Sequence, residues 1–150
     1  GEVAWALRRH EFGCDKLHHL DSLTDHLLGL RALLEPEGPT SGRLGQRLAV
    51  LCAMPEDRAR LAERTARAVA LERSAVTGLS AHESEAIELC REIEGHLRAL
   101  VRDVICGHLD SDLCGKADRM LADASGADDL PGFEREDPIR GWNDPDSLAA

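Results

Sequence analysis

The sequence predicts an all-α protein, a bundle of about five helices joined by short connections. Of its 150 residues, 43% are hydrophobic but only 3% are aromatic, so the core must be built from leucine, alanine, valine and isoleucine. Leucine and alanine favour helices, and there are few runs of β-branched residues that would favour strands. Long segments lack glycine and proline, and their apolar residues recur every three or four positions, as on one face of a helix.

The first helix is expected over residues 2–34. Leucines between Leu20 and Leu34 recur at helical spacing and form an apolar stripe. The helix should end before Pro36, because a residue that precedes proline avoids the α conformation. Residues 35–41 are rich in proline, glycine and hydroxyl side chains, a composition typical of a loop.

Two further helices follow this loop. The first of them is expected from about residue 42, with Ser41 or Thr40 available to cap its amino terminus. The next should begin at Pro55, because proline suits the first position of a helix and two acidic residues follow it in the positive first turn. Gly78 is well placed to end that helix.

The clearest helical pattern in the chain begins with Ser80-Ala-His-Glu83, which has the form of a capping box. Apolar residues then alternate by three and four as far as Gly107, which is expected to end the helix. One more short helix is expected between Leu109 and Leu121.

The composition changes near the carboxyl end. Residues 126–150 contain three prolines and seven acidic side chains against two arginines. We therefore divide the chain into a helical domain, 1–125, and an acidic, irregular tail, 126–150.

Charge and cysteine usage narrow the function classes. A formal net charge of −10 opposes non-specific attraction to nucleic acid or to an anionic membrane surface. No run of about 18 apolar residues is present, so no membrane span is expected. The five cysteines are odd in number and include no Cys-x-x-Cys pair, which favours free thiols and a cytoplasmic location.

A family resemblance lies between residues 23 and 78. The pieces come in this order: a leucine-rich helix with a loop, Arg-x-Ala-x-Leu at Arg47, Pro-Glu-x-Arg at Pro55, and a helix ending Arg73-Ser74-x-x-x-Gly78. This order resembles the HEPN superfamily of helical nucleotide-binding and RNase domains, especially its abortive-infection and Apea-type branches. The resemblance extends over residues 2–124 and implies a HEPN-like helical bundle.

The chain departs from the family pattern at Gly78, where the pattern has a histidine. The resemblance implies that the arginine stabilises phosphate charge, while the histidine moves protons during attack by the ribose 2′-hydroxyl, without a metal ion or another cofactor. Imidazole suits this role because its pKa lies near neutrality, and glycine cannot replace it.

The resemblance therefore implies a catalytically degenerate module with no catalytic residue. It would bind a partner protein, or a nucleotide or RNA phosphate, through Arg73 and Ser74, in a stress or phage-defence system. It also implies a homodimer, for which the leucine-rich first and fourth helices offer a surface.

Two alternatives remain open. The first is a metal-independent RNase that uses a displaced histidine, His82 or His96. Arg91 and His96 match the Arg-x₄-His spacing, but five helical positions place them about 140° apart around the axis. The second is a purely structural helical domain of a larger regulatory protein.

Two other patterns bear on chemistry. His10, Cys14 and His18 are spaced by four, and histidine and cysteine are both zinc ligands. Three ligands in a row on one helix cannot surround an ion, whereas two of them with groups from another helix could. The interpretation that competes with metal binding is that Cys14 is a core residue. The arginines of residues 58–73 alternate with acidic residues, which favours a solvated face with i,i+4 ion pairs.

Overall fold

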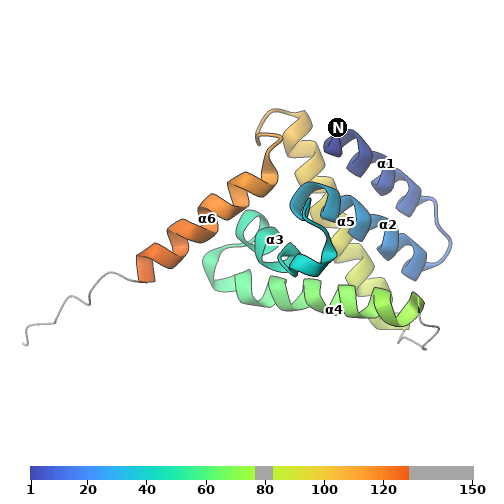
Figure 1. Cartoon of the computed structure of the whole chain (residues 1–150). Helices are drawn as coiled ribbons and strands as arrows, with labels where there is room; N and C mark the ends of the chain where they lie inside the picture. Colours follow the sequence, from blue (N-terminus) through green and yellow to red (C-terminus); the bar gives the residue numbers. More distant parts are fainter. Residues whose placement is uncertain (77–82, 129–150) are drawn as a thin grey trace, which may run out of the picture.

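The computed structural model describes residues 1–76 and 83–128, and all regular structure in these residues is helical (Figure 1). This confirms the predicted all-α class. The elements are α1 (Glu2–Cys14), α2 (His19–Leu34), the 3-10 turn η1 (Pro39–Ser41), α3 (Leu44–Cys52), the 3-10 turn η2 (Pro55–Asp57), α4 (Arg58–Val76), α5 (Glu83–Ile105) and α6 (Leu113–Asp128).

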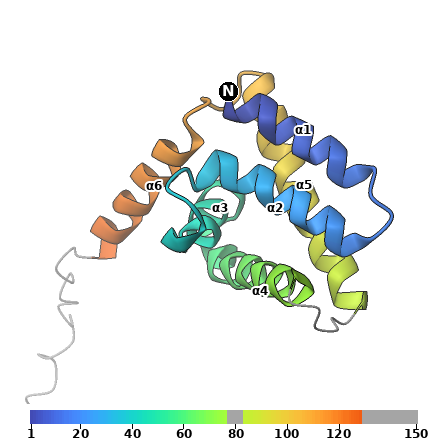
Figure 2. The same cartoon turned by 45° about the vertical axis from the view of Figure 1, so that its right-hand side comes forward.

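The prediction of a single helix over residues 2–34 is wrong. The chain leaves the helix after Cys14, turns over residues 15–18, and returns as α2, antiparallel to α1 (Figure 2). The reason is a close approach at Gly13: a Cβ built there would lie 2.3 Å from Cε1 of His26. Glycine thus lets the end of α1 fold back against α2, and the hairpin buries apolar surface that one long helix would leave exposed.

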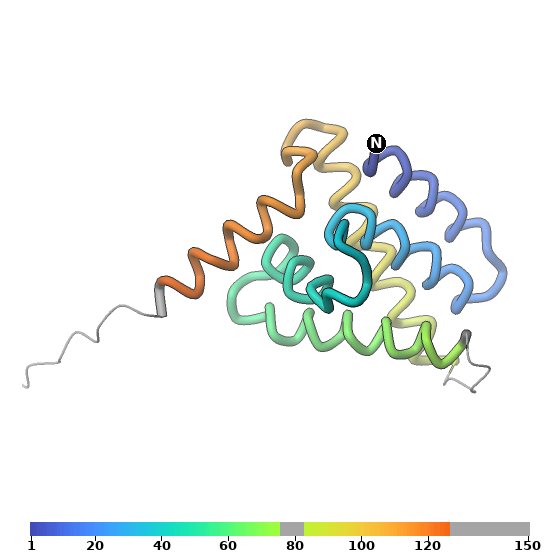
Figure 3. The backbone as a smooth tube through the Cα atoms, in the orientation of Figure 1, coloured from blue at the N-terminus to red at the C-terminus, as the bar shows by residue number. Residues whose placement is uncertain are grey.

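Helix α2 is the centre of the bundle and contacts each of the other five α-helices of the described residues (Figure 3). It ends at Leu34, before Pro36, as predicted. Its fully buried leucines are Leu23, Leu27, Leu30 and Leu34. They pack against α5 residues that are also buried, among them Ile93, Leu97 and Leu100. Because these side chains fill the core of one chain, a dimer would need a surface other than the leucine-rich faces we expected.

Helix α3 begins two residues later than expected, and neither Ser41 nor Thr40 is its N-cap residue. The N-cap position belongs to Arg43, whose backbone N–H is bound by the Ser41 hydroxyl oxygen at 3.3 Å. Pro55 does begin a helical segment, but its first turn is the 3-10 turn η2, and α4 starts at Arg58. The expected stop at Gly78 lies outside the described residues.

Helix α5 begins at Glu83, so most of the expected capping box lies outside the described residues. It ends at Ile105, and Gly107 follows with φ of +74°, the left-handed conformation that glycine adopts after a helix. Helix α6 starts later than Leu109, at Leu113, where the Asp112 carboxylate accepts the N–H of Gly115 at 2.8 Å. It continues to Asp128, and the rest of the expected tail lies outside the described residues.

None of the described helices is long and apolar enough to cross a lipid bilayer.

Candidate functional site

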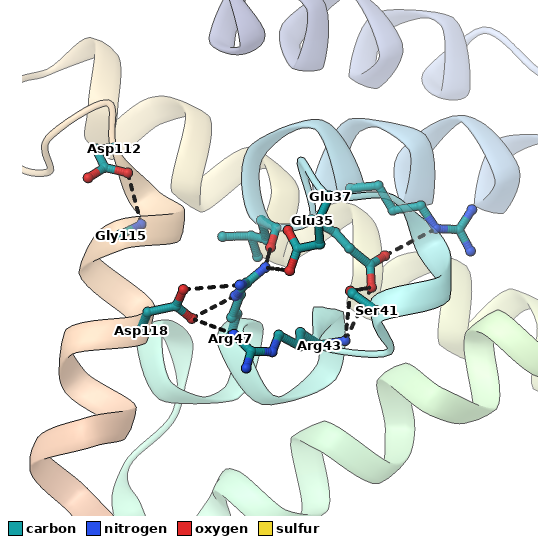
Figure 4. A network of polar contacts seen from close by, with 10 residues as sticks. Glu35, Glu37, Ser41, Arg43, Arg47, Asp112, Gly115 and Asp118 are labelled. Carbon is teal, nitrogen blue, oxygen red and sulfur yellow. Dashed lines mark hydrogen bonds and ion pairs between the residues drawn. The ribbon is translucent and has the colours of Figure 1, made fainter.

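A buried arginine links the helices around one of the cavities of the bundle. Arg47 of α3 is 3% exposed and donates to the Leu34 carbonyl at 2.7 Å and to Glu37 at 2.6 Å (Figure 4). Its other nitrogens, Nε and Nη2, donate to the two carboxylate oxygens of Asp118 at 2.8 and 3.0 Å. The hydrogen bond from Arg47 holds the pKa of Asp118 below its ordinary value. One guanidinium therefore joins the end of α2, the following loop, α3 and α6.

The same region fixes Arg43 at the start of α3. Buried Glu35 accepts hydrogen bonds from the Ser41 hydroxyl at 2.7 Å and from the Arg43 backbone N–H at 3.2 Å. The exposed Arg43 guanidinium lies 3.9 Å from Asp118 (Figure 4). The backbone of Arg43 is thus held by Glu35 and Ser41, while its side chain reaches Asp118 of α6.

A cavity of about 570 Å³ lies between α3, the start of α4 and α6. Its polar lining consists of Arg43, Gln46, Arg58, Asp118 and Ser125. Two guanidinium groups therefore face a single carboxylate, which Arg47 already binds. On a chain with a net charge of −10, this is a locally positive lining.

Among the residues that line this cavity, Arg58 has a buried donor without a partner. It forms no ion pair with any residue of 1–76 or 83–128, and its Nε is buried without a hydrogen-bond partner. A buried, unsatisfied donor costs about 1–3 kcal/mol, and a rotation of the Arg58 side chain that brought this nitrogen to a ligand oxygen in the cavity would remove the cost. Arginine binds phosphate oxygens particularly well because its planar guanidinium can donate two parallel hydrogen bonds.

The residues expected from the family resemblance lie far from this cavity. Arg73 is exposed in the last turn of α4, about 22 Å along the helix from Arg58 at 1.5 Å per residue. Ser74 is half-buried, and its hydroxyl donates to the Ala70 carbonyl at 3.1 Å. Gly78 lies outside the described residues, so the geometry of the complete motif is not described.

The alternative acid–base residues have different surroundings. His82 lies outside the described residues. Arg91 is exposed, whereas His96 is half-buried and lines a second cavity of about 390 Å³ together with Arg60 and Arg64. The structure therefore separates Arg91 from His96 and instead brings the imidazole to two arginines of α4. Burial lowers the pKa of His96, so its ring is neutral at pH 7.

The arginines of α4 do not form the expected i,i+4 pairs. Arg64 binds Glu92 of α5 through two hydrogen bonds of 2.9 Å, and Arg67 binds Glu85, which also lies on α5. Glu72, the neighbour of Arg73, is buried and binds Arg31 of α2 at 2.9 Å. These arginine and glutamate side chains therefore form ion pairs between α4 and its neighbouring helices. Such pairing between helices could not be predicted from the local sequence pattern.

Of the predicted metal-ligating residues, two remain together. His10 and Cys14 lie one turn apart on α1, with the Cys14 sulfur 3.8 Å from Nε2 of His10. Cys14 is exposed, so the competing interpretation of it as a core residue is wrong. His18 is exposed at the N-cap of α2 and does not belong to this cluster.

The fold and cavity define an all-α protein with a positively charged pocket between three helices. No protein-family model, curated protein or solved structure matches the chain. The HEPN resemblance stays a prediction.

Proposed function

We propose that this chain is a helical module that binds a phosphate-bearing ligand, a nucleotide or an RNA phosphate, in the cavity between α3, α4 and α6. The observation that supports this most directly is the unpaired Arg58 beside Arg43. The proposal keeps the ligand class that the HEPN resemblance implies, but it assigns the phosphate contact to Arg43 and Arg58 instead of Arg73. A HEPN-like module in a stress or phage-defence system is compatible with such a ligand.

The size and lining of the cavity support a small ligand. A volume of about 570 Å³ lies within the range of about 300–1,000 Å³ that is usual for small-molecule sites. None of the residues of 1–76 and 83–128 that line the cavity is aromatic, so these residues would give a base no stacking energy and the phosphate would contribute most of the affinity. Binding should therefore weaken strongly as salt is raised.

The same lining favours binding over catalysis. No histidine of the described residues borders this cavity, and the Asp118 carboxylate is held ionised by Arg47, so the lining formed by this part of the chain offers no proton acceptor near neutrality. We therefore propose no bond cleavage at this site.

The test is calorimetric titration with pyrophosphate, a mononucleotide and a short 5′-phosphorylated RNA, at low and physiological salt. We expect Arg58→Gln to weaken binding about 10- to 100-fold, which corresponds to the loss of a charge-assisted hydrogen bond. The matched control is Arg8→Gln, because Arg8 is an exposed arginine of α1 away from the cavity. Absence of binding by all three ligands, or equal affinities of wild type and Arg58→Gln, would contradict the proposal.

A specific observation also favours the RNase alternative: neutral His96 shares its cavity with Arg60 and Arg64. A neutral imidazole can accept the proton of a 2′-hydroxyl, while Arg60 offsets phosphate charge; Arg64 is already bound by Glu92, which lines the same cavity. Labelled RNA should then be cleaved with and without EDTA, and His96→Ala should abolish cleavage, whereas His19→Ala, at an exposed histidine of α2, should not. Cleavage that persists in His96→Ala would eliminate this alternative.

A homodimer also remains our prediction. Because the core leucines are buried, the surface would have to come from exposed apolar residues such as Trp5, Leu7 and Phe12 of α1. Light scattering at high micromolar concentration should return twice the mass of the chain, and a strict monomer would contradict the prediction. A chain that neither binds phosphate nor cleaves RNA would favour the purely structural domain, or a module that binds a partner protein.

A further inference from the structure

Three helices of the bundle bring metal-ligating side chains together on the side of the molecule away from the arginine cavity. Helices α1, α2 and α5 pack against one another (Figures 1 and 2). His10 and Cys14 of α1 face Glu94 of α5, and one ligand atom from each lies within 4.8 Å of the other two. Among the described residues, this is the group of three such side chains that could hold one ion.

The spacing of these atoms is close to that of a tetrahedral zinc site. Zn–S bonds of about 2.3 Å and Zn–N or Zn–O bonds of about 2.0 Å at tetrahedral angles separate S from N by about 3.6 Å, and N from O by about 3.3 Å. Here the Cys14 sulfur lies 3.8 Å from Nε2 of His10, and that nitrogen lies 3.6 Å from Oε1 of Glu94. The third pair, the Cys14 sulfur and a Glu94 oxygen, lies within 4.8 Å, so side-chain movements of up to about 1 Å would bring all three atoms to tetrahedral distances.

A fourth side chain of this kind borders the cluster and lacks a partner. His26 of α2 is 2% exposed, and its Nδ1 is buried with no hydrogen bond. The face of its ring at Cε1 lies against α1 at Gly13, between His10 and Cys14: a Cβ on Gly13 would lie 2.3 Å from Cε1, 2.7 Å from Nδ1 and 2.8 Å from Nε2. The rings of His10 and His26 have centroids 5.6 Å apart. Buried polar groups normally form hydrogen bonds, so the unpaired Nδ1 of His26 indicates that a hydrogen-bond partner can bind here.

The ion pairs that Glu94 forms with its neighbours contribute too little stability to explain why these side chains are gathered here. Glu94 is shared between His10 and Arg98, whose Nη1 lies 3.5 Å from the same oxygen, and both pairs are partly exposed. Such pairs contribute little to stability.

We propose that His10, Cys14 and Glu94 bind one divalent transition-metal ion, and that zinc is the best match to their nitrogen, sulfur and oxygen donors. Magnesium and calcium prefer oxygen ligands alone, so they fit this set poorly. A water molecule in the fourth position would give Nδ1 of His26 the partner it lacks. The ion connects α1 to α5 beside α2, and the site is independent of the phosphate-binding cavity.

The test uses the untagged chain, freed of metal by a chelator and then titrated with zinc against a chromophoric competitor and, separately, with cobalt. We expect one zinc per chain, a cobalt spectrum with the thiolate charge-transfer band of a tetrahedral site, and a higher melting temperature in the presence of zinc. Cys14→Ser should remove the thiolate band and weaken zinc binding at least about 100-fold. Glu94→Gln should weaken it while leaving the band.

Two matched controls lie close by. His18→Ala changes an exposed histidine four residues after Cys14, and Cys106→Ser changes an exposed thiol of the same chain. Neither should alter the stoichiometry or the affinity. His26→Gln should weaken zinc binding about 10- to 100-fold and preserve the thiolate band, as expected for a group that binds the metal-bound water. No zinc retained by the wild type, or equal zinc binding by wild type and Cys14→Ser, would overturn the proposal.

Discussion

Asp118→Asn should change stability and ligand affinity in opposite directions. The Asp118 side chain belongs to two structures at once, because it accepts two hydrogen bonds from buried Arg47 and also lines the arginine cavity. Its negative charge stabilises the Arg47 network but repels a phosphate in the cavity. Asparagine removes this charge with almost no change in shape.

The two magnitudes follow from the geometry. A hydrogen bond to a charged group contributes about 1.5–3 kcal/mol, but the Asp118 side chain is 40% exposed and Arg47 keeps Glu37 and the Leu34 carbonyl, so we expect a loss of about 1 kcal/mol in unfolding free energy. A phosphate charge roughly 7 Å away, at an effective dielectric constant of about 40–80, is repelled by about 0.6–1.2 kcal/mol. Asp118→Asn should therefore bind pyrophosphate about three- to eightfold more tightly.

Urea unfolding followed by circular dichroism measures the first effect, and calorimetric titration at low salt measures the second. Arg119→Gln is a suitable control, because Arg119 is an exposed neighbour on α6 that does not line the cavity. Weaker phosphate binding by Asp118→Asn would refute the reasoning, since it would mean that the ligand does not approach this carboxylate. An unchanged unfolding free energy would show that the Arg47 network does not depend on the charge of Asp118.

Further predictions concern stability. Gly13→Ala should lower the free energy of unfolding in urea by about 1–3 kcal/mol, because the new Cβ meets the His26 ring. Gly95→Ala, which has open space around its Cβ, should raise it by about 0.5–1 kcal/mol. Equal effects of the two substitutions would contradict the packing we describe. Glu72→Ala should cost about 1–3 kcal/mol, because partly buried Arg31 loses the carboxylate that accepts two of its hydrogen bonds and keeps only Glu35, 3.9 Å away. Exposed Glu63→Ala should change stability by less than about 0.5 kcal/mol. Because the pKa of Asp118 is lowered in the folded state, its contribution is complete above about pH 4 and is lost as the pH falls through the folded value, so the stability difference between wild type and Asp118→Asn should shrink in acid. The pKa of His96 is also lowered in the folded state, so below about pH 6.5 the unfolded chain binds a proton at this residue more readily than the folded chain does. The free energy of unfolding should therefore fall on acidification, and it should fall less in His96→Asn than in the wild type.

Local sequence patterns predicted the helices well where one residue decides the outcome. Pro36 ends α2 and Gly107 follows α5, because backbone conformation at these positions depends on the residue itself. The break at Cys14 was missed because its cause is not local. Gly13 is compatible with a continuous helix, and only the ring of His26, thirteen residues later, requires the absence of a Cβ there.

The candidate sites could be predicted only in part, for the same reason. The spacing of His10 and Cys14 indicates two ligands on one helical turn, but Glu94 is separated from them by 80 residues and follows no motif. Arg43 and Arg58 likewise belong to different helices, and the sequence alone shows neither that they meet nor that Arg58 lacks an acidic partner. The positive run over residues 58–73 suggested one uniform, solvated surface. In the fold, Arg64 and Arg67 are neutralised by α5, while Arg58 is left unpaired beside a cavity. Charge counted along a helix therefore does not show which of its arginines lack a carboxylate partner, because the pairing is decided by the neighbouring helices.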